Sequence, residues 1–167
     1  DDVYGVADCG WGILFARNAQ EAGDLALICR GVAEDTETPF MNVQDGFLTT
    51  HTIENVRLPE LELMKMFVGH PAERNRPLFD PRVPMMSGVV QNQDSYMKGK
   101  IAQRKYYDKV LPALKEVMRE YNFLTGRKYD VVMPYRLDDA EYAIVGSGCM
   151  IETGEAAVDY IREHYGI

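Results

Sequence analysis

Residues 18–46, NAQEAGDLALICRGVAEDTETPFMNVQDG, decide the fold class. In the first half of this stretch, apolar residues recur at spacings of three and four, which predicts a helix with one apolar face. The residues of that face are Ala22, Leu25, Ala26, Cys29, Val32 and Ala33. Asn18 followed by Glu21 matches a capping box, in which the asparagine caps a free backbone N–H and the glutamate reaches back to the N-cap N–H. The helix therefore begins at about Asn18.

Extended segments are predicted on both sides of this helix. After it, PFMNVQ (39–44) indicates a strand, and a proline is allowed at the first position of a strand. Before it, DVYGVA (2–7) predicts a strand and WGILFA (11–16) a second short extended piece, because β-branched and aromatic residues favour the extended state. Strand, helix and strand in this order indicate a βαβ unit and an α/β fold with a parallel sheet.

The turn at Asp45-Gly46 has two interpretations. It ends a parallel strand, or it is a two-residue hairpin turn that returns the chain antiparallel. We favour the parallel strand, because residues 48–60 hold no second strand of matching length. We expect strands at Val3–Val6, Phe40–Gln44 and Tyr142–Val145, each parallel to a neighbour in the complete protein. The Asp45 loop then lies at a carboxyl edge of the sheet.

Helices and one long irregular stretch occupy the middle of the chain. LPELELMKMFVG (58–69) predicts a short helix. Its inward residues are Leu61, Met64 and either Phe67 or Val68. The stretch from His70 to about Gly99 contains four prolines and is expected to be irregular, and such a long loop in a compact domain usually serves function or covers a neighbour. Residues 99–126 are helical in pattern, with Pro112 as a kink or as the first turn of a second helix, and with Gly126 as the residue that ends it.

The C-terminal part predicts two extended segments and a helix. KYDVVMPY (128–135) is extended, EYAIVGSG (141–148) is a strand that ends in a Gly-x-Gly turn, and residues 149–167 are helical. The inward residues of that helix are Ile151, Ala156 or Ala157, Tyr160 and Ile161. A strand and helix normally lead to another parallel strand, and the sequence stops where that strand would begin. We therefore expect a piece of a longer polypeptide, with a domain junction near residues 135–141.

Composition excludes several classes of protein. The chain has 167 residues, enough for one domain or for parts of two. Its net charge of −8 repels the phosphate backbone, which argues against a nucleic-acid partner. It has no run of 18 apolar residues, so no membrane span is expected. The first residues, DDVYGVADCG, lack the apolar stretch of a secretory signal peptide, and we expect a cytoplasmic protein.

Cysteine and histidine are sparse and scattered. The cysteines are Cys9, Cys29 and Cys149, and the histidines are His51, His70 and His164. No two cysteines have the C-x₂-C spacing that clusters and zinc sites use, and no two histidines are near each other in sequence. We therefore expect reduced cytosolic thiols and no metal site in this chain.

Two short segments are candidates for a site. Asp45, Thr49, Thr50 and His51 follow a predicted parallel strand, at the edge where ligands of α/β sheets gather. The alternative is that Asp45 and the threonine hydroxyls satisfy backbone groups of the loop, while His51 packs at the surface.

The second candidate is the turn Gly146-Ser147-Gly148, which follows a predicted strand as in a dinucleotide-binding fingerprint. Ile151 occupies the position of the third glycine of that fingerprint, so a tight strand-to-helix turn is the simpler interpretation. The helix N-terminus at this turn is nevertheless suited to hold an anion.

Four further motifs follow one another along nearly the whole chain. They are DGFLTTH (45–51), QNQDSYMKG (91–99), LTGRKYDVV (124–132) and DDAEYAIVGSGCMIET (138–153). In this order and spacing the chain resembles the thiamine-diphosphate-dependent 2-oxoacid:ferredoxin oxidoreductases, with pyruvate:ferredoxin (flavodoxin) oxidoreductase as the nearest comparison. The resemblance implies that residues 1–135 are the later part of the pyrimidine-binding thiamine-diphosphate domain. Residues 136–167 would begin a domain similar to the C-terminal domain of transketolase, and both domains are α/β.

The resemblance also implies an activity for the complete protein. The thiazolium carbanion of thiamine diphosphate, bound with Mg²⁺, would attack the carbonyl of a 2-oxo acid, and carbon dioxide would leave because the ring accepts the electron pair. Electrons would pass singly to [4Fe-4S] clusters and then to ferredoxin or flavodoxin, and coenzyme A would take the acyl group. The partners implied are the remaining domains or subunits of the enzyme, in a homodimer or higher oligomer.

The same resemblance implies that the catalytic machinery lies outside this chain. The activating glutamate and the threonine and arginine that meet the substrate belong upstream of Asp1. The Gly-Asp-Gly segment for magnesium and diphosphate, and the cluster cysteines, belong to another domain or subunit. We therefore expect no catalytic residue here, and no binding of thiamine diphosphate or a cluster by this chain alone. Asp45, Thr49, Thr50 and His51 are expected to shape the pocket or a domain contact.

The resemblance leaves the substrate and two alternatives open. The turn VADCGWG (6–12) replaces the glutamine-threonine turn expected in the pyruvate enzyme, so pyruvate is favoured without being fixed. The first alternative is a non-catalytic segment that serves only assembly of a multi-subunit complex. The second is a nucleotide-binding α/β domain that uses the turn at Gly146.

Overall fold

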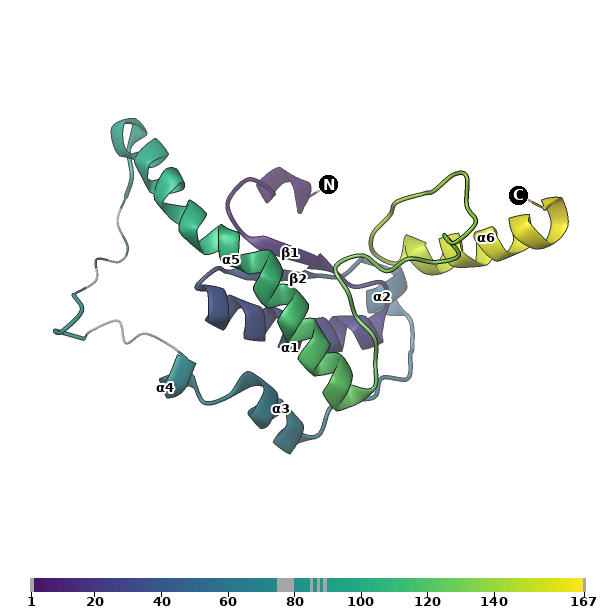
Figure 1. Ribbon diagram of the computed structural model, residues 1–167, viewed down its shortest axis with the longest axis horizontal. Coiled ribbons are helices and arrows are strands. Elements are labelled where there is room, and N and C mark those ends of the chain that lie inside the picture. Colours follow the sequence, from purple (N-terminus) through teal and green to yellow (C-terminus); the bar gives the residue numbers. More distant parts are fainter. Residues whose placement is uncertain (1, 75–79, 85, 87, 89, 167) are drawn as a thin grey trace.

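The computed structural model describes residues 2–74, 80–84, 86, 88 and 90–166, and it has an α/β architecture (Figure 1). Its elements are η1 (Tyr4–Val6), β1 (Gly12–Phe15), α1 (Ala19–Thr36), β2 (Phe40–Val43), α2 (Leu48–His51), α3 (Leu61–Val68), α4 (Pro71–Arg74), α5 (Gln93–Thr125) and α6 (Met150–Tyr165). A two-stranded parallel sheet packs against α1, and α1 packs in turn against α5 and α3. The core therefore lies between α1 and the two helices that cover its outer side.

The predicted βαβ unit is confirmed. β1 and β2 pair in parallel, from Gly12 opposite Phe40 to Phe15 opposite Val43, and α1 connects them. The hairpin interpretation of Asp45-Gly46 is wrong, because the chain continues into α2 instead of a returning strand. Parallel pairing places the carboxyl ends of both strands at one edge of the sheet.

The first strand of the unit is the short segment at Gly12–Phe15, and the prediction of a strand at Val3–Val6 is wrong. The backbone N–H of Val6 donates to the Val3 carbonyl at 3.1 Å, and Tyr4–Val6 form a turn of 3₁₀ helix at the surface. Strand propensity is realised only where a partner strand supplies a ladder. The place beside β2 is taken by Gly12–Phe15, and among the described residues Val3–Val6 have no partner strand.

At the N-terminus of α1, one of the two hydrogen bonds of the predicted capping box forms and the other does not. Asn18 Oδ1 accepts the backbone N–H of Glu21 at 2.9 Å, as predicted. The Glu21 carboxylate, however, accepts the backbone N–H of Arg17 at 2.9 Å, one residue before the N-cap. A contact of 2.9 Å between Glu21 and the Arg17 guanidinium accompanies this shift.

The buried face of α1 is rotated from the predicted one. Leu25, Cys29 and Val32 are buried as expected, whereas Ala26 is exposed and Asp24 is fully buried. Alanine is found both at the surface and in the core, so it says little about which side of a helix is buried. Aspartate is normally exposed. Asp24 lies inside because four hydrogen-bonding side chains meet it there, which a pattern of apolar residues does not encode.

The hydrophobic core joins α1, α3 and α5. Its buried members are Ala16, Leu25, Ile28, Val32, Phe67, Leu114, Val117, Met118, Tyr121 and Tyr129. The rings of Phe67 and Tyr121 meet edge to face at 5.0 Å between centroids. α3 is a helix as predicted and buries Phe67, but Leu61 is exposed, so the predicted inward side is only partly right.

α5 is one helix of 33 residues that runs through Pro112, so no second helix begins there. It ends where predicted, at Gly126, whose N–H donates to the Asn122 carbonyl at 2.9 Å. It begins at Gln93, earlier than expected, and α4 also lies inside the stretch predicted to be irregular. Residues 75–79, 85, 87 and 89 of that stretch lie outside the described residues.

The strand predicted at Tyr142–Val145 does not form in this chain. Residues 127–149 contain neither strand nor helix, and Tyr142, Ile144 and Val145 are 83%, 88% and 93% exposed. A strand needs a neighbour to pair with, and the β1–β2 sheet does not extend to these residues.

α6 is helical as predicted, but the residues predicted to face inward are not buried. None of its residues is buried, and Tyr160 and Ile161 are exposed. Two polar contacts join α6 to the segment before it. Tyr135 Oη donates to Asp159 at 2.7 Å, and Arg162 pairs with Asp139 at 2.7 Å. The segment and α6 therefore form one small unit at the C-terminal end of the chain.

Candidate functional site

The carboxyl edge of the sheet is where the two strand ends meet α6. β1 is followed by Ala16, Arg17 and Asn18, and β2 by Gln44 and Asp45. In Figure 1 the start of α6 lies near this edge, beside α2. Because ligands of parallel sheets gather at such edges, the contacts made here decide what the chain contributes to a site.

Asp45 binds the start of α6. Its Oδ2 accepts the backbone N–H of Cys149, the residue that precedes the helix, at 2.5 Å. A Cβ atom at Gly148 would lie 2.3 Å from the same oxygen, and Gly148 has a positive φ of 76°. Both facts require glycine at this position. The carboxylate also lies at the positive end of the helix dipole.

The anion expected at the Gly146-Ser147-Gly148 turn is therefore supplied by the chain itself. Asp45 occupies the helix N-terminus at which we considered an external anion. The pKa of the Cys149 thiol is raised, chiefly by its hydrogen bond with the same carboxylate. Partial burial of the thiol raises it as well. Cys149 is thereby held as a neutral thiol and is a poor candidate for a nucleophile.

The end of β1 holds the next turns of α6. The Arg17 guanidinium donates to Glu155 at 3.0 Å, and the Asn18 side-chain amide donates to Glu152 at 2.7 Å. Glu152 and Glu155 lie three residues apart and so share one side of α6. Arg17 and Asn18 were not predicted as contact residues. Their position directly after a predicted strand could have indicated a contact at this edge. Asn18 was interpreted only as a helix cap.

Thr49, Thr50 and His51 lie apart from this contact. Thr49 is buried, and its hydroxyl has no hydrogen-bond partner among the described residues. Thr50 Oγ1 lies 2.7 Å from His51 Nδ1, and the His51 ring stacks on Phe47 at 5.2 Å between centroids. Thr50 and His51 are exposed on α2, so of the four predicted residues Asp45 is the one that contacts α6.

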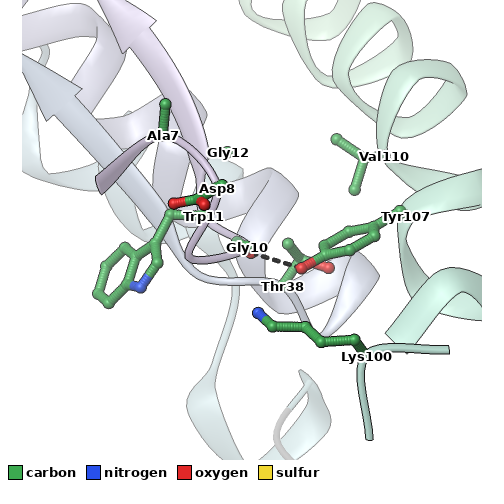
Figure 2. A pocket seen from close by; sticks show the side chains of 9 residues that line it. All are labelled: Ala7, Asp8, Gly10, Trp11, Gly12, Thr38, Lys100, Tyr107 and Val110. Carbon is green, nitrogen blue, oxygen red and sulfur yellow. Dashed lines mark hydrogen bonds between the residues drawn. The ribbon is translucent and has the colours of Figure 1, made fainter. Parts of the chain in front are cut away.

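A second concave region lies at the opposite, amino edge of the sheet. A cavity of about 370 Å³ lies between the segment before β1 and α5. Figure 2 shows the side chains that line it. It is lined by Ala7, Asp8, Gly10, Trp11, Gly12, Thr38, Lys100, Tyr107 and Val110. Tyr107 Oη donates to the Gly10 carbonyl at 3.0 Å, and Lys100 Nζ donates to the Cys9 carbonyl at 3.1 Å.

These two bonds fix the segment before β1 to α5. A Cβ atom at Gly10 would lie 2.1 Å from Tyr107 Oη, and Gly10 has a φ of 99°. Lys100 and Tyr107 are seven residues apart, which places them on one side of the helix. The sequence could therefore have shown that Lys100 and Tyr107 share a side of the helix. It could not have shown that they contact the turn VADCGWG (6–12), because about ninety residues separate the two segments.

The buried Asp24 is the strongest polar centre of the core, and sequence reasoning missed it. Tyr121 and Tyr129 donate their hydroxyls to it at 2.6 and 2.5 Å, and the Arg127 guanidinium pairs with it at 2.5 Å. Burial, reinforced by the Asp24 carboxylate, raises the pKa of Tyr121 to about 12 and also raises the pKa of Tyr129. This cluster ties the segment after α5 to α1, and its residues are not among those that line the cavity described above, so we interpret it as structural.

Two kinds of feature are absent from the described part of the chain. No three His, Cys, Asp or Glu side chains converge there as a metal ion would require. Within the same residues, no helix combines the length and the apolar character needed to cross a bilayer.

Comparison with known proteins identifies the chain's relatives. A family model described as pyruvate flavodoxin/ferredoxin oxidoreductase, thiamine-diphosphate-binding, matches residues 1–119. The chain is 35% identical over 164 residues to pyruvate synthase subunit PorA of Thermotoga maritima, covering 97% of this chain and 42% of the relative. It is 34% identical over 166 residues to pyruvate-flavodoxin oxidoreductase of Trichormus variabilis, covering 96% of this chain and 14% of the relative.

A more distant relative is pyruvate dehydrogenase (NADP+) of Cryptosporidium parvum, 30% identical over 165 residues, of which the chain covers 8%. The chain thus spans less than half the length of each of these relatives. The family match covers most of the chain, and it includes the βαβ unit, the Asp45 loop and most of α5. The chain therefore belongs to the pyruvate flavodoxin/ferredoxin oxidoreductase family, in its thiamine-diphosphate-binding region.

Proposed function

We propose that the chain is a segment of an enzyme that oxidatively decarboxylates a small 2-oxo acid, with pyruvate as the favoured substrate. The observation that carries this proposal is the similarity of nearly the whole chain to pyruvate synthase subunit PorA. In the overall reaction, the bond between the carboxylate and the keto carbon breaks and carbon dioxide leaves. Coenzyme A loses its thiol proton and takes the acyl group, and two electrons pass one at a time to ferredoxin or flavodoxin.

We assign the polar end of the thiamine-diphosphate site to other parts of the complete protein. Diphosphate with Mg²⁺ needs converging hard oxygen ligands, and the described residues bring together no such group. The buried Asp24 is already occupied by two tyrosines and an arginine. Magnesium, diphosphate and the [4Fe-4S] clusters are therefore assigned to other parts of the complete protein, and no catalytic residue is assigned here.

We assign the carboxyl edge a positioning role. Residues 1–135 form the pyrimidine-binding side, and residues 136–167 begin the next domain, similar to the C-terminal domain of transketolase. Three contacts that cross this boundary support the assignment, namely Asp45 with Cys149, Arg17 with Glu155 and Asn18 with Glu152. Asp45 sets how the second domain meets the sheet, while Thr49, Thr50 and His51 line the neighbouring pocket or contact.

The proposed partners follow from the same similarity. The complete protein assembles with further domains or subunits of the enzyme, as a homodimer or higher oligomer in the cytoplasm. The naming of the Thermotoga relative as a subunit supports a multi-part enzyme. A segment that served assembly alone would share these partners but would not affect turnover.

The experiment is an anaerobic assay of the complete enzyme with methyl viologen as the electron acceptor. A panel of 2-oxo acids is tested with and without coenzyme A, and turnover of pyruvate that depends on coenzyme A is expected. Failure of every 2-oxo acid, with cofactor bound and clusters intact, would overturn the proposal. Turnover of a larger 2-oxo acid without turnover of pyruvate would correct the substrate alone.

A second measurement tests whether this chain alone can bind the cofactor. Titration calorimetry of this 167-residue chain with thiamine diphosphate and Mg²⁺ is expected to show no micromolar binding, because our proposal assigns the hard oxygen ligands to other parts of the protein. Stoichiometric binding would show that the chain holds a complete cofactor site.

A further inference from the structure

Four consecutive residues at the start of α1 hold two different segments of the carboxyl edge. Arg17 and Asn18 donate to two glutamates of α6, as described above. The next two residues, Ala19 and Gln20, bind the segment that follows α2. We call residues 45–57, which contain α2 and this segment, the carboxyl-edge loop.

The end of the carboxyl-edge loop is attached to α1 by hydrogen bonds. Gln20 Oε1 accepts the backbone N–H of Arg57 at 2.7 Å, and Gln20 Nε2 donates to the Arg57 carbonyl at 3.2 Å. Glu54 Oε2 accepts the backbone N–H of Ala19 at 3.2 Å. Residues 50–58 are all exposed, so burial contributes little to holding this part of the loop. The paired bonds to Gln20 are therefore its main attachment to the helix.

The orientation of the Gln20 amide is set by Asp24, one helical turn later. Gln20 Nε2 lies 3.2 Å from Asp24 Oδ2. A carboxylate only accepts hydrogen bonds, so the amide must turn its nitrogen toward Asp24, which leaves its oxygen for the Arg57 N–H. The nitrogen has two N–H groups, one for Asp24 and one for the Arg57 carbonyl. Turning the amide over would break all three bonds.

Asp24 is itself fixed in the core. It is fully buried, and Tyr121, Tyr129 and Arg127 all bind its carboxylate. Moving the carboxylate would leave these buried donors unpaired, which is costly. Gln20 therefore connects a group whose position is fixed inside the chain with an exposed loop at the carboxyl edge.

We propose that Gln20 is a positioning residue, which fixes the carboxyl-edge loop relative to the buried Asp24. The proposal rests on the proposed function, because this loop carries the four residues assigned above to the pocket or the domain contact. Asp45 holds the start of the loop at α6, and Gln20 holds its end at α1. Gln20 touches no reacting atom and acts on turnover only through the loop.

The first test measures hydrogen exchange in the complete enzyme. Gln20→Leu keeps a side chain of similar length and removes every bond of the amide. Exchange of the Arg57 amide, resolved by fragmentation in the mass spectrometer, is expected to become about tenfold faster. Gln93→Leu is the matched control, because Gln93 is exposed at the start of α5, and a change within about twofold is expected. Unchanged exchange at Arg57 in Gln20→Leu would overturn the proposal.

Gln20→Glu tests the same bonds through their dependence on pH. A neutral carboxyl group has one O–H, which can donate to Asp24, and one carbonyl oxygen, which can accept the Arg57 N–H. Once charged, it can only accept and is repelled by Asp24. The same repulsion raises the pKa of the introduced group. Exchange at Arg57, relative to the unchanged enzyme, should therefore become faster as the pH rises from about 6 to about 8.

The other titratable groups at this place do not produce that result. Burial and the Asp24 carboxylate raise the pKa of Tyr121 and Tyr129, so both keep their protons at pH 8. Arg127 stays charged throughout this range. Asp24 and Glu54 are present in the unchanged enzyme too, so the comparison at equal pH removes their contribution. A ratio that does not change with pH would contradict the assignment of these bonds to Gln20.

Turnover then separates this proposal from the proposed function. With pyruvate and methyl viologen, kcat/KM is expected to fall by about ten- to a hundredfold in Gln20→Leu, since a misplaced supporting group costs up to about that much. In Gln20→Glu, kcat/KM relative to the unchanged enzyme should recover as the pH is lowered toward 6. Faster exchange at Arg57 with unchanged kcat/KM would overturn the positioning role. Failure of the unchanged enzyme with every 2-oxo acid would instead contradict the proposed function and leave the exchange results standing.

Discussion

The carboxylate of Asp45, directly after β2, accepts the backbone N–H of Cys149, which lies 104 positions later in the chain and directly before α6. The strand end and the helix start are thus joined by one hydrogen bond at the positive end of the helix. Because no residue of α6 is buried, this bond and two side-chain contacts from the end of β1 hold the helix to the sheet.

Asp45→Ala is expected to loosen the start of α6. The loss of one acceptor for a helix-terminal N–H costs about 1 kcal/mol, which corresponds to about fivefold faster amide exchange. Hydrogen exchange measured by mass spectrometry should show this change at residues 149–153 and none in α1. Gln44→Ala, at an exposed neighbour, is the control.

The Cys149 thiol offers an independent readout of the same bond. Asp45 raises the pKa of this thiol, so Asp45→Asn should speed its alkylation by iodoacetamide at pH 8. Cys29, whose pKa burial raises to about 12, should stay unreactive in both proteins. An unchanged rate at Cys149 would contradict the contact.

Gly148→Ala should disrupt the hydrogen bond between Asp45 and the Cys149 N–H by changing the turn that precedes α6. A Cβ atom there would lie 2.3 Å from the Asp45 oxygen on a backbone with φ of 76°, and strain of this kind costs about 1–3 kcal/mol. Gly154→Ala is the matched control, because a Cβ atom at Gly154 meets nothing within 4 Å and alanine favours a helix interior by about 1 kcal/mol. Urea unfolding should therefore show opposite changes in stability for the two variants. Changes of the same sign would show that Gly148 is not constrained as described.

The sequence predicted most of what depends on neighbours along the chain. The strand at Phe40–Val43, the helix from Asn18 and the end of α5 at Gly126 follow from local spacing and capping, and the structure confirms them. It failed where a partner far away in sequence decides the outcome. Val3–Val6 has strand-forming residues but no strand to pair with, and Asp24 is buried only because groups about a hundred residues later reach it.

In the candidate site, too, local features were predictable and distant contacts were not. The position of Asp45 after a strand was sufficient to single it out, since parallel strands collect ligands at that edge. Its partner at Cys149 was not predictable, because the two residues lie 104 positions apart in the chain. The roles of Arg17, Lys100 and Tyr107 have the same origin, since each contacts a distant segment.

Asp24→Ala is expected to cost on the order of 3 kcal/mol of folding stability. The change leaves the Arg127 guanidinium without its carboxylate and removes the acceptor of two buried tyrosine hydroxyls. Asp108→Asn is the control, because its side chain is 70% exposed and its ion pair is long, and a change within about 0.5 kcal/mol is expected. Urea unfolding of both variants measures the difference. Equal effects would mean that the buried cluster adds no more stability than a surface pair.

The same cluster predicts instability in alkali. The pKa of Tyr121 is raised from 10 to about 12, and that of Tyr129 is raised as well, because burial and Asp24 disfavour the phenolates. The folded chain therefore keeps these protons where the unfolded chain has lost them. The stability they contribute is complete below about pH 10 and declines as the pH rises from 10 through 12. Urea midpoints measured across this range should fall less steeply in Tyr121→Phe, and parallel slopes would contradict the assignment.

In the complete enzyme, Asp45→Ala should reduce turnover without abolishing it. Asp45 holds the second domain in place and touches no reacting atom in our proposal, and a misplaced supporting group costs on the order of a hundredfold in rate at most. Asp45→Asn keeps an oxygen that accepts the Cys149 N–H, so it should recover most of the activity. Anaerobic viologen reduction gives kcat and KM for pyruvate in each variant, and hydrogen exchange at residues 149–153 gives the state of the contact. Turnover and exchange should change together if the role is positioning. Complete loss of turnover in Asp45→Asn with an intact contact would instead assign the carboxylate a chemical role.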